Sequence, residues 1–246
     1  MTGSVCLNCG GGPTIRAHLI PQSFVREVKG RDTDHAFVQS DGQKYTSSKN
    51  GLFDDYLLCA ECDGRLGAHE NYVLGLLSGL RGKTTALKTN HLFEAHVDGN
   101  RFLRFATGIA WKYASTARER GRIEVGPYAN LLRDISLNRA VIPSSVDAFV
   151  CRLHSGDGEV YIYRAPKLDK QLGVNFVRFS VGGFVIFLKL DKRPNPQAQP
   201  ASNWVRGASS FSFPVLPMTA FEEGRFALTA RRQNPKLDAF LNRVSR

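Results

Sequence analysis

The sequence lacks several features that mark common classes of protein. It has no run of about 18 apolar residues, so we expect no membrane-spanning helix. Residues 1–5 show no signal-peptide pattern, which leads us to expect a cytoplasmic protein. A nucleotide-binding phosphate loop is also missing, because Gly82-Lys83-Thr84 has no glycine at the required upstream position. These absences direct attention to the composition and to the cysteines.

Acidic residues are few relative to basic ones. The chain carries 33 Lys and Arg against 22 Asp and Glu, a formal net charge of +11. Such an excess favours nucleic acid as a partner, with DNA as the first expectation, because each neutralised phosphate releases counterions. The alternative is that the charge only keeps the protein soluble, and salt-insensitive or absent nucleic-acid binding would support that reading.

Cysteine is scarce, but four of the five cysteines are paired in the sequence. Cys6 and Cys9 form one Cys-x-x-Cys pair, and Cys59 and Cys62 form another. This spacing lets two thiolates of one tight turn reach a single tetrahedral ion, so two pairs complete a four-sulfur Zn²⁺ site. Without a secretory signal, bound metal is favoured over disulfides. We expect the fifth, Cys151, to be a core residue of a strand.

Local patterns predict the elements around these pairs. Residues 14–20 are typical of a short strand, which Pro21 ends because it has no amide hydrogen to donate. Residues 30–50 are polar and predict an irregular segment. After Cys62 the apolar spacing predicts a helix over residues 63–79. A pair of cysteines that leads directly into a helix is typical of a treble-clef zinc module.

The remainder predicts a mixture of helices and strands. A basic segment at 81–90 reads as a linker, and glycine pairs or Gly-containing turns indicate β-hairpins. The predicted helices are 101–120, 128–137 and 236–244, and the predicted strands are 91–97, 148–153, 159–164, 175–181, 184–190 and 209–215. We therefore expect an α+β fold: a zinc-stapled treble-clef or ββα-metal-like module over residues 1–80, followed over residues 81–246 by a helical segment and an antiparallel β region.

The order of motifs in the first quarter of the chain resembles that of the HNH endonucleases. It consists of a Cys-x-x-Cys pair, the strand sequence His18-Leu19-Ile20-Pro21, Asn50-Gly51, and the second Cys-x-x-Cys pair. The resemblance covers about residues 6–70 and is greatest to a bacterial group whose strand reads Ser/Ala-His-Ile-Ile-Pro. It implies a ββα-metal core and a metal-dependent hydrolase of phosphodiester bonds in nucleic acid.

The resemblance also implies roles for particular residues. His18 matches the histidine that activates water, as a neutral imidazole can. Asn50 is similar to the central asparagine that orients the histidine loop. Asp63, His69 and Glu70 match positions that hold a catalytic divalent metal, for which Mg²⁺ or Mn²⁺ suits the carboxylates. That ion would stabilise negative charge on the phosphorane-like transition state and on the leaving 3′ oxygen.

One position departs from the family pattern and keeps a second reading open. Ala17 stands where many members carry an acidic metal ligand. The rival is a non-catalytic treble-clef protein that binds nucleic acid or a protein partner through the same zinc-stapled module. In that reading His18 is structural, Glu70 is a carboxylate favoured by the helix dipole, and His69 is a solvated neighbour.

Overall fold

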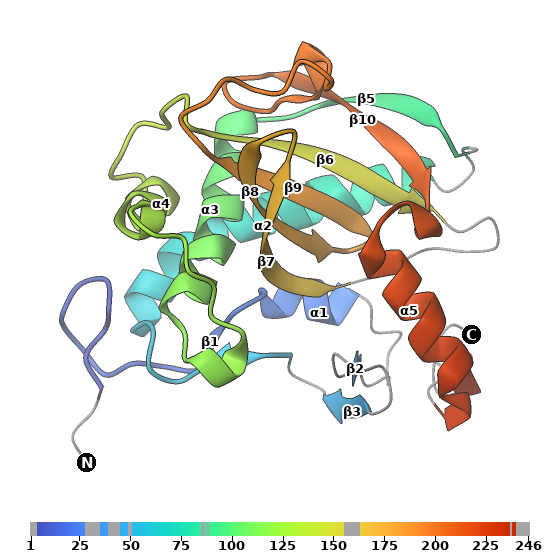
Figure 1. Cartoon of the computed structure of the whole chain (residues 1–246). Helices are drawn as coiled ribbons and strands as arrows, with labels where there is room; N and C mark the ends of the chain where they lie inside the picture. The colour runs from blue at the N-terminus through green and yellow to red at the C-terminus, as the bar shows by residue number, and fades with distance from the viewer. Residues whose placement is uncertain are drawn as a thin grey trace.

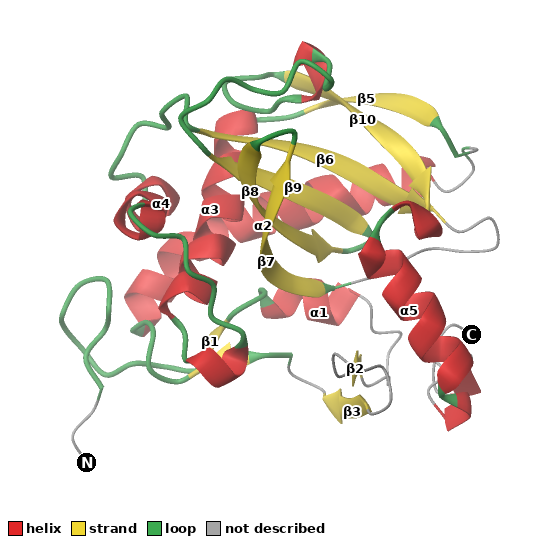
Figure 2. Ribbon diagram, in the orientation of Figure 1, coloured by secondary structure: helices red, strands yellow, loops and turns green. Residues whose placement is uncertain are grey.

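The computed structural model describes residues 4–27, 35–38, 45–48, 51–84, 87, 89–154, 163–236 and 238–239. These residues form a mixed α+β structure, which confirms the predicted class. Figure 2 shows helices packed behind a twisted sheet, with the N-terminal segments lying below both. No helix within the described ranges is both long and apolar enough to span a bilayer.

The helices and strands have the following bounds. The helices are α1 (Gln22–Glu27), α2 (Ala60–Thr84), α3 (Gly99–Ser115), α4 (Tyr128–Ser136) and α5 (Glu222–Gln233), with short 3₁₀ turns at Arg118–Arg120, Ala201–Asn203 and Met218–Ala220. The strands are β1 (Ala17–His18), β2 (His35–Val38), β3 (Tyr45–Ser48), β4 (Phe53–Asp54), β5 (His91–His96), β6 (Val146–His154), β7 (Arg164–Gln171), β8 (Val174–Val181), β9 (Phe184–Leu190) and β10 (Ser210–Pro217).

Six strands form the main sheet, in the order β5-β10-β6-β9-β8-β7 (Figure 1). The pairs β8–β9 and β7–β8 are hairpins. The turn between β8 and β9 contains Gly182 and Gly183, whose φ angles of 57° and 80° suit glycine in a tight hairpin turn. The predicted β8–β9 hairpin is therefore confirmed. Four of the five strand pairs in this sheet are antiparallel, as predicted, and the fifth pair, β10–β6, is parallel.

The main core lies between the sheet and the helices α2 and α3. Side chains that alternate along each strand point to opposite faces, and Val177, Phe179 and Val181 of β8 join this core. From α3, Phe102 and Phe105 pack into the same cluster. The cluster contains residues from both sides of residue 80, although the predicted division into two domains stays a prediction.

The other face of the sheet carries a smaller aromatic cluster. Phe149 stacks on Phe187 with ring centroids 4.5 Å apart, and Trp204 from the loop before β10 lies edge-on to Phe149 at 5.2 Å. Cys151 belongs to this cluster and is 3% exposed. Burial raises the pKa of its thiol to about 12. The prediction that Cys151 is a core residue of a strand is confirmed.

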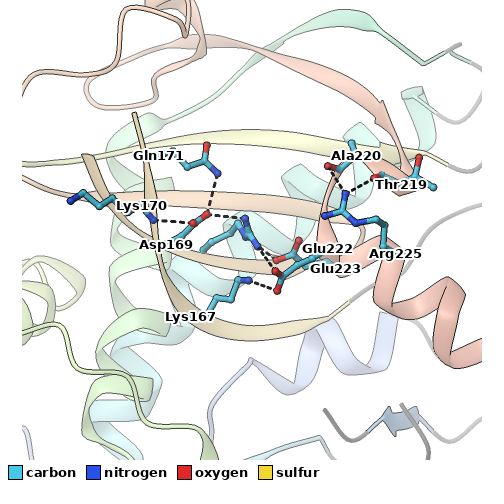
Figure 3. A network of polar contacts seen from close by, with 10 residues as sticks. Lys167, Asp169, Lys170, Gln171, Thr219, Ala220, Glu222, Glu223 and Arg225 are labelled. Atoms are coloured by element: carbon cyan, nitrogen blue, oxygen red, sulfur yellow. Dashed lines mark hydrogen bonds and ion pairs between the residues drawn. The ribbon is translucent and has the colours of Figure 1, made fainter. Parts of the chain in front are cut away.

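Charge also anchors α5 to the sheet (Figure 3). Arg178 of β8 is 7% exposed and forms ion pairs with Asp169 at 2.8 Å, Glu223 at 2.9 Å and Glu222 at 3.4 Å. Lys167 of β7 pairs with Glu222 as well. A buried guanidinium needs such partners, because an uncompensated buried charge is strongly destabilising.

Several element boundaries differ from the sequence predictions. The strand predicted at 148–153 pairs with β9 and β10, while the predicted turn 155–158 and most of the predicted strand 159–164 lie outside the described residues. Residues 81–84 continue α2 instead of forming a linker, because the guanidinium of Arg81 is buried and donates to the carbonyl of Gly182 at 3.1 Å. Most of the predicted helix 236–244 lies outside the described residues, and α5 precedes it.

Candidate metal centre and the adjoining polar cluster

The structure brings the four paired cysteines together. Their sulfur atoms all lie within 4.8 Å of one another, although the two pairs are about 50 residues apart in the sequence. Cys6 and Cys62 are buried, Cys59 is half-buried and Cys9 is exposed. Within the described ranges this is the only group of three or more Cys, His, Asp or Glu side chains that converges so closely.

The spacing of the sulfurs fits a tetrahedral zinc ion. Zn–S bonds of about 2.3 Å place two ligands of a tetrahedron about 3.8 Å apart. The sulfurs of Cys9 and Cys59 lie 3.8 Å apart. A disulfide would require about 2.05 Å. The four cysteines can therefore hold a metal ion such as Zn²⁺.

Backbone hydrogen bonds hold the two cysteine turns against each other. The amide of Leu7 donates to the carbonyl of Leu57 at 2.9 Å, and the amide of Ile15 donates to that of Leu58 at 2.8 Å. Gly10 and Gly12 have φ angles of 71° and 57°, which let the first turn fold back beneath its sulfurs. The segment before the second pair thus lies against both the first cysteine turn and the residues that follow that turn.

Polar contacts favour thiolates in this cluster. Burial alone would raise the pKa of Cys6, but hydrogen bonds from the backbone around Cys59, Cys9 and Asn8 outweigh it and bring that pKa to about 6. The side-chain amide of Asn8 donates to the sulfur of Cys62 at 3.0 Å. Burial nevertheless raises the pKa of Cys62 to about 12. Four thiols this close need a cation before all can lose their protons.

A second polar cluster lies beside the cysteines and begins with His18. His18 ends β1, which pairs antiparallel with β4 so that His18 faces Phe53 and Ala17 faces Asp54. Asp54 is 2% exposed, accepts a hydrogen bond from Thr116 at 2.5 Å and forms an ion pair with Arg120 at 2.7 Å. Burial opposes ionisation of Asp54, yet these partners lower its pKa. The contacts with Thr116 and Arg120 connect β4, which pairs with the His18 strand β1, to the residues that follow α3.

Lys112 of α3 connects His18 to α2. Its ammonium group donates to the carbonyl of His18 at 2.7 Å and to a carboxylate oxygen of Glu70 at 2.8 Å. The side chain is 1% exposed, so the two contacts are shielded from water. Lys112 stands between Trp111 and Tyr113 in the sequence, and all three side chains are buried.

Asp63 and Glu70 lie on the same side of α2. Seven residues are almost two full turns of an α-helix, so the two carboxylates face one way. Burial raises the pKa of Asp63; Glu70 raises it further, while the positive charges of Lys112 and His18 lower it. His18, Asp63, Glu70 and Lys112 therefore lie within electrostatic reach of one another, and we call them the His18 cluster.

His69 turns away from this cluster. Its imidazole Nε2 lies 3.2 Å from the side-chain amide nitrogen of Asn138, which follows α4. Burial lowers the pKa of His69, and the charges of Arg104 and Arg101 lower it further. His69 is 8% exposed, so it is not the solvated side chain that the non-catalytic alternative predicted. Asn50 lies outside the described residues.

The candidate ligands fit a catalytic metal only in part. Asp63 and Glu70 offer two carboxylates, but His69 faces another element and Ala17 is fully buried. The ammonium of Lys112 is already bonded to Glu70. No third Cys, His, Asp or Glu of the described chain converges on the two carboxylates. The residues present therefore do not complete a three-ligand site for Mg²⁺ or Mn²⁺.

The sequence analysis missed the residues that organise the site from a distance. Asp54 and Thr116 stand in no recognisable motif and Asn8 is a variable position of the first Cys-x-x-Cys pair; each acts through a partner 54 or more residues away. Lys112 could have been found from one signal, a lone lysine within the apolar stretch 105–113.

In comparisons with protein-family models, curated proteins and solved structures, nothing matches the chain.

Proposed function

We propose that the protein is an HNH-like endonuclease that hydrolyses phosphodiester bonds of nucleic acid, DNA in the first place. Its four cysteines would hold a structural Zn²⁺ in a treble-clef arrangement. Support comes from the sulfur spacing and from Cys59 and Cys62, which lie immediately before α2 and in its first turn. His18 would be the general base.

A single observation carries the proposal. Support comes from the position of His18, on a strand that follows the first cysteine pair, within electrostatic reach of Asp63 on α2, which in turn is within reach of Glu70. This is the association that the motif order predicts for a hydrolytic centre. Lys112 bridges the strand and the helix, so the relative placement of base and carboxylates is held by buried contacts.

The chain's own residues supply three parts of the reaction. A neutral His18 imidazole would take the proton from a water molecule as its oxygen attacks phosphorus and the bond to the 3′ oxygen breaks. The carboxylate of Asp63 would favour the protonated imidazole that results, since opposite charges attract. Lys112 would hold the strand of His18 and the carboxylate of Glu70 in position, because its buried ammonium group bonds to both residues. Mg²⁺ or Mn²⁺ dependence remains a prediction for the assay.

The test is cleavage of plasmid and single-stranded DNA by the wild type, His18→Ala and His96→Ala. His96 is an exposed histidine of β5 and serves as the matched control. Loss of a general base costs roughly 10²–10⁴-fold in rate, so we expect His18→Ala to be at least about 100-fold slower. Each reaction is run with Mg²⁺, with Mn²⁺ and with chelator, and zinc content is measured on every protein.

Two outcomes would contradict the proposal. One is equal cleavage by His18→Ala and the wild type, which would point to a contaminating nuclease or to another centre. The other is no cleavage by the wild type with any metal. His96→Ala must behave as the wild type for the comparison to stand.

A second candidate function rests on a specific observation. The ammonium of Lys112 binds Glu70, and Ala17 fills a fully buried position where the family pattern has an acidic ligand. These features favour a zinc-stapled module that binds nucleic acid or a protein partner without cutting. Absence of cleavage together with salt-sensitive DNA binding would establish the nucleic-acid form of this alternative.

A further inference from the structure

A cavity on the side of the molecule bearing α3 and α4 is separate from the His18 cluster. It encloses about 400 Å³, within the range of small-molecule sites. Three segments build its wall: the start of α3, the loop after α4 and the loop before β10. The lining residues are Asn100, Arg104, Asn138, Arg139, Ala140, Val141, Ile142, Arg206 and Gly207. We call this cavity the arginine pocket.

The pocket concentrates positive charge. Arg104, Arg139 and Arg206 line it, and no Asp or Glu does. None of these three guanidinium groups has a carboxylate within 4.0 Å among the residues that the structure describes. Arg178, by contrast, meets three carboxylates. The charge of the pocket is therefore not balanced within the described chain, and an anion would balance it.

Two of the guanidinium groups are held in place by neutral acceptors. Arg104 donates to the carbonyl of Ile135 in α4 at 2.9 Å, and Arg139 donates to the side-chain oxygen of Asn8 at 2.8 Å. A guanidinium group has five N–H donors, so each of these bonds orients the group and leaves further donors for a ligand. Groups held before binding lose less conformational entropy when the ligand arrives.

The back wall of the pocket is ordered by His69. Asn138, which lines the pocket, lies 3.2 Å from His69 through its amide nitrogen, and His69 is buried behind it on α2. The lowered pKa of His69 keeps the imidazole neutral, and a neutral ring nitrogen can accept from that amide. This accounts for His69, which the sequence assigned to a metal site.

The chemistry of the lining indicates the class of ligand. Planar guanidinium forks match pairs of phosphate oxygens, and several together suit a doubly charged group. The apolar wall of Ala140, Val141 and Ile142 gives room for more than an inorganic ion, and Val141 is 89% exposed. We propose that the arginine pocket binds the phosphate of a nucleotide, either free or as part of a nucleic-acid strand. The inference does not depend on hydrolysis at His18.

The experiment compares binding by the full chain and by three variants. Adenosine monophosphate, inorganic phosphate and a single-stranded oligonucleotide are titrated against the wild type, Arg139→Gln, Arg206→Gln and Arg232→Gln. Arg232, an exposed arginine of α5, is the matched control. Zinc content and thermal stability are recorded for each protein, because Arg139 contacts Asn8 beside the cysteines. Arg206 has no such contact, so its variant tests the pocket alone.

We expect each pocket variant to weaken binding roughly tenfold or more, with Arg232→Gln unchanged. Competition by adenosine monophosphate against the oligonucleotide would identify a site for a single nucleotide. Oligonucleotide binding that neither small ligand displaces, yet that falls in the pocket variants, would identify a site for the phosphate of a strand. The proposal is overturned if none of the three ligands binds the wild type, or if Arg206→Gln binds them as tightly as the control.

Discussion

The segment that carries the cysteines and the six-stranded sheet hold together in different ways. Around the cysteines, several apolar side chains stay in water: Val5 is 61% exposed, Leu7 52% and Tyr56 62%. In the sheet, every residue of β9 is buried, and two hydrophobic clusters cover its two faces. We propose that a metal ion held by the four cysteines would stabilise this segment, because its exposed apolar side chains contribute little to offset the entropy of ordering it. The sheet needs none.

The largest expected effect is the difference in stability between a variant that lacks a cysteine of the N-terminal cluster and one that lacks the cysteine of the sheet. Cys62→Ala should abolish zinc binding and unfold the N-terminal segment, because structural zinc contributes roughly 10 kcal/mol or more. Cys151→Ala removes a buried sulfur from the sheet and should cost only about 1 kcal/mol. Zinc content and urea denaturation of both variants measure the difference. Equal losses would show that the cysteine cluster is not a metal site.

An intermediate effect is expected from the aromatic cluster of the sheet. Phe187→Ala leaves a cavity beside Phe149 and should lower the free energy of unfolding by roughly 3–5 kcal/mol. Zinc should stay bound, because Phe187 belongs to a different hydrophobic cluster from Cys6 and Cys62. Leu92→Ala, at a position 59% exposed on β5, is the control and should change stability by no more than about 0.5 kcal/mol. Zinc loss in Phe187→Ala would mean that the two regions depend on each other.

The smallest expected effect is on stability, from removing the negative charge of Glu222, which pairs α5 with the sheet. Hydrogen bonding and ion pairing with Lys167 lower the pKa of Glu222 below its usual 4.5. A carboxyl group with a lowered folded-state pKa adds stability above its unfolded pKa, and loses it as the pH falls through the folded value. The stability difference between the wild type and Glu222→Gln should therefore stay constant from neutral pH to about 5 and shrink to zero below that.

Urea denaturation at a series of pH values measures this difference. Glu94→Gln is the control, since Glu94 is exposed on β5 and makes no ion pair among the described residues. The comparison between variants cancels the effect of acid on the cysteines, which both proteins share. A difference that persists at pH 3 would show that Glu222 acts through packing and not through its charge.

The parts of the site that depend on local sequence spacing were predictable. The parts that depend on contacts between distant segments were not. The Cys-x-x-Cys pairs bring their own geometry, because both thiols of a pair lie in one tight turn. The helix after Cys62 likewise carries Asp63 and Glu70 on one face through its own periodicity. Lys112, Asp54 and Thr116 act across 42 or more residues, and no local rule relates their positions. For the same reason the pairing of β6 with β9 and β10 was not predictable: the partners lie 30 or more residues further along the chain, and no local pattern relates them to β6.

The sequence by itself determined the four-sulfur cluster, the mixed α+β class, the core role of Cys151 and most of the helices, since these follow from local spacing and periodicity. Only the tertiary structure decided where the charges lie. It buried Lys112 between His18 and Glu70, turned His69 toward Asn138, and left three arginines around one cavity without carboxylates in reach among the described residues. Charge interacts through space, so its pattern depends on which elements meet and not on the order of residues along the chain.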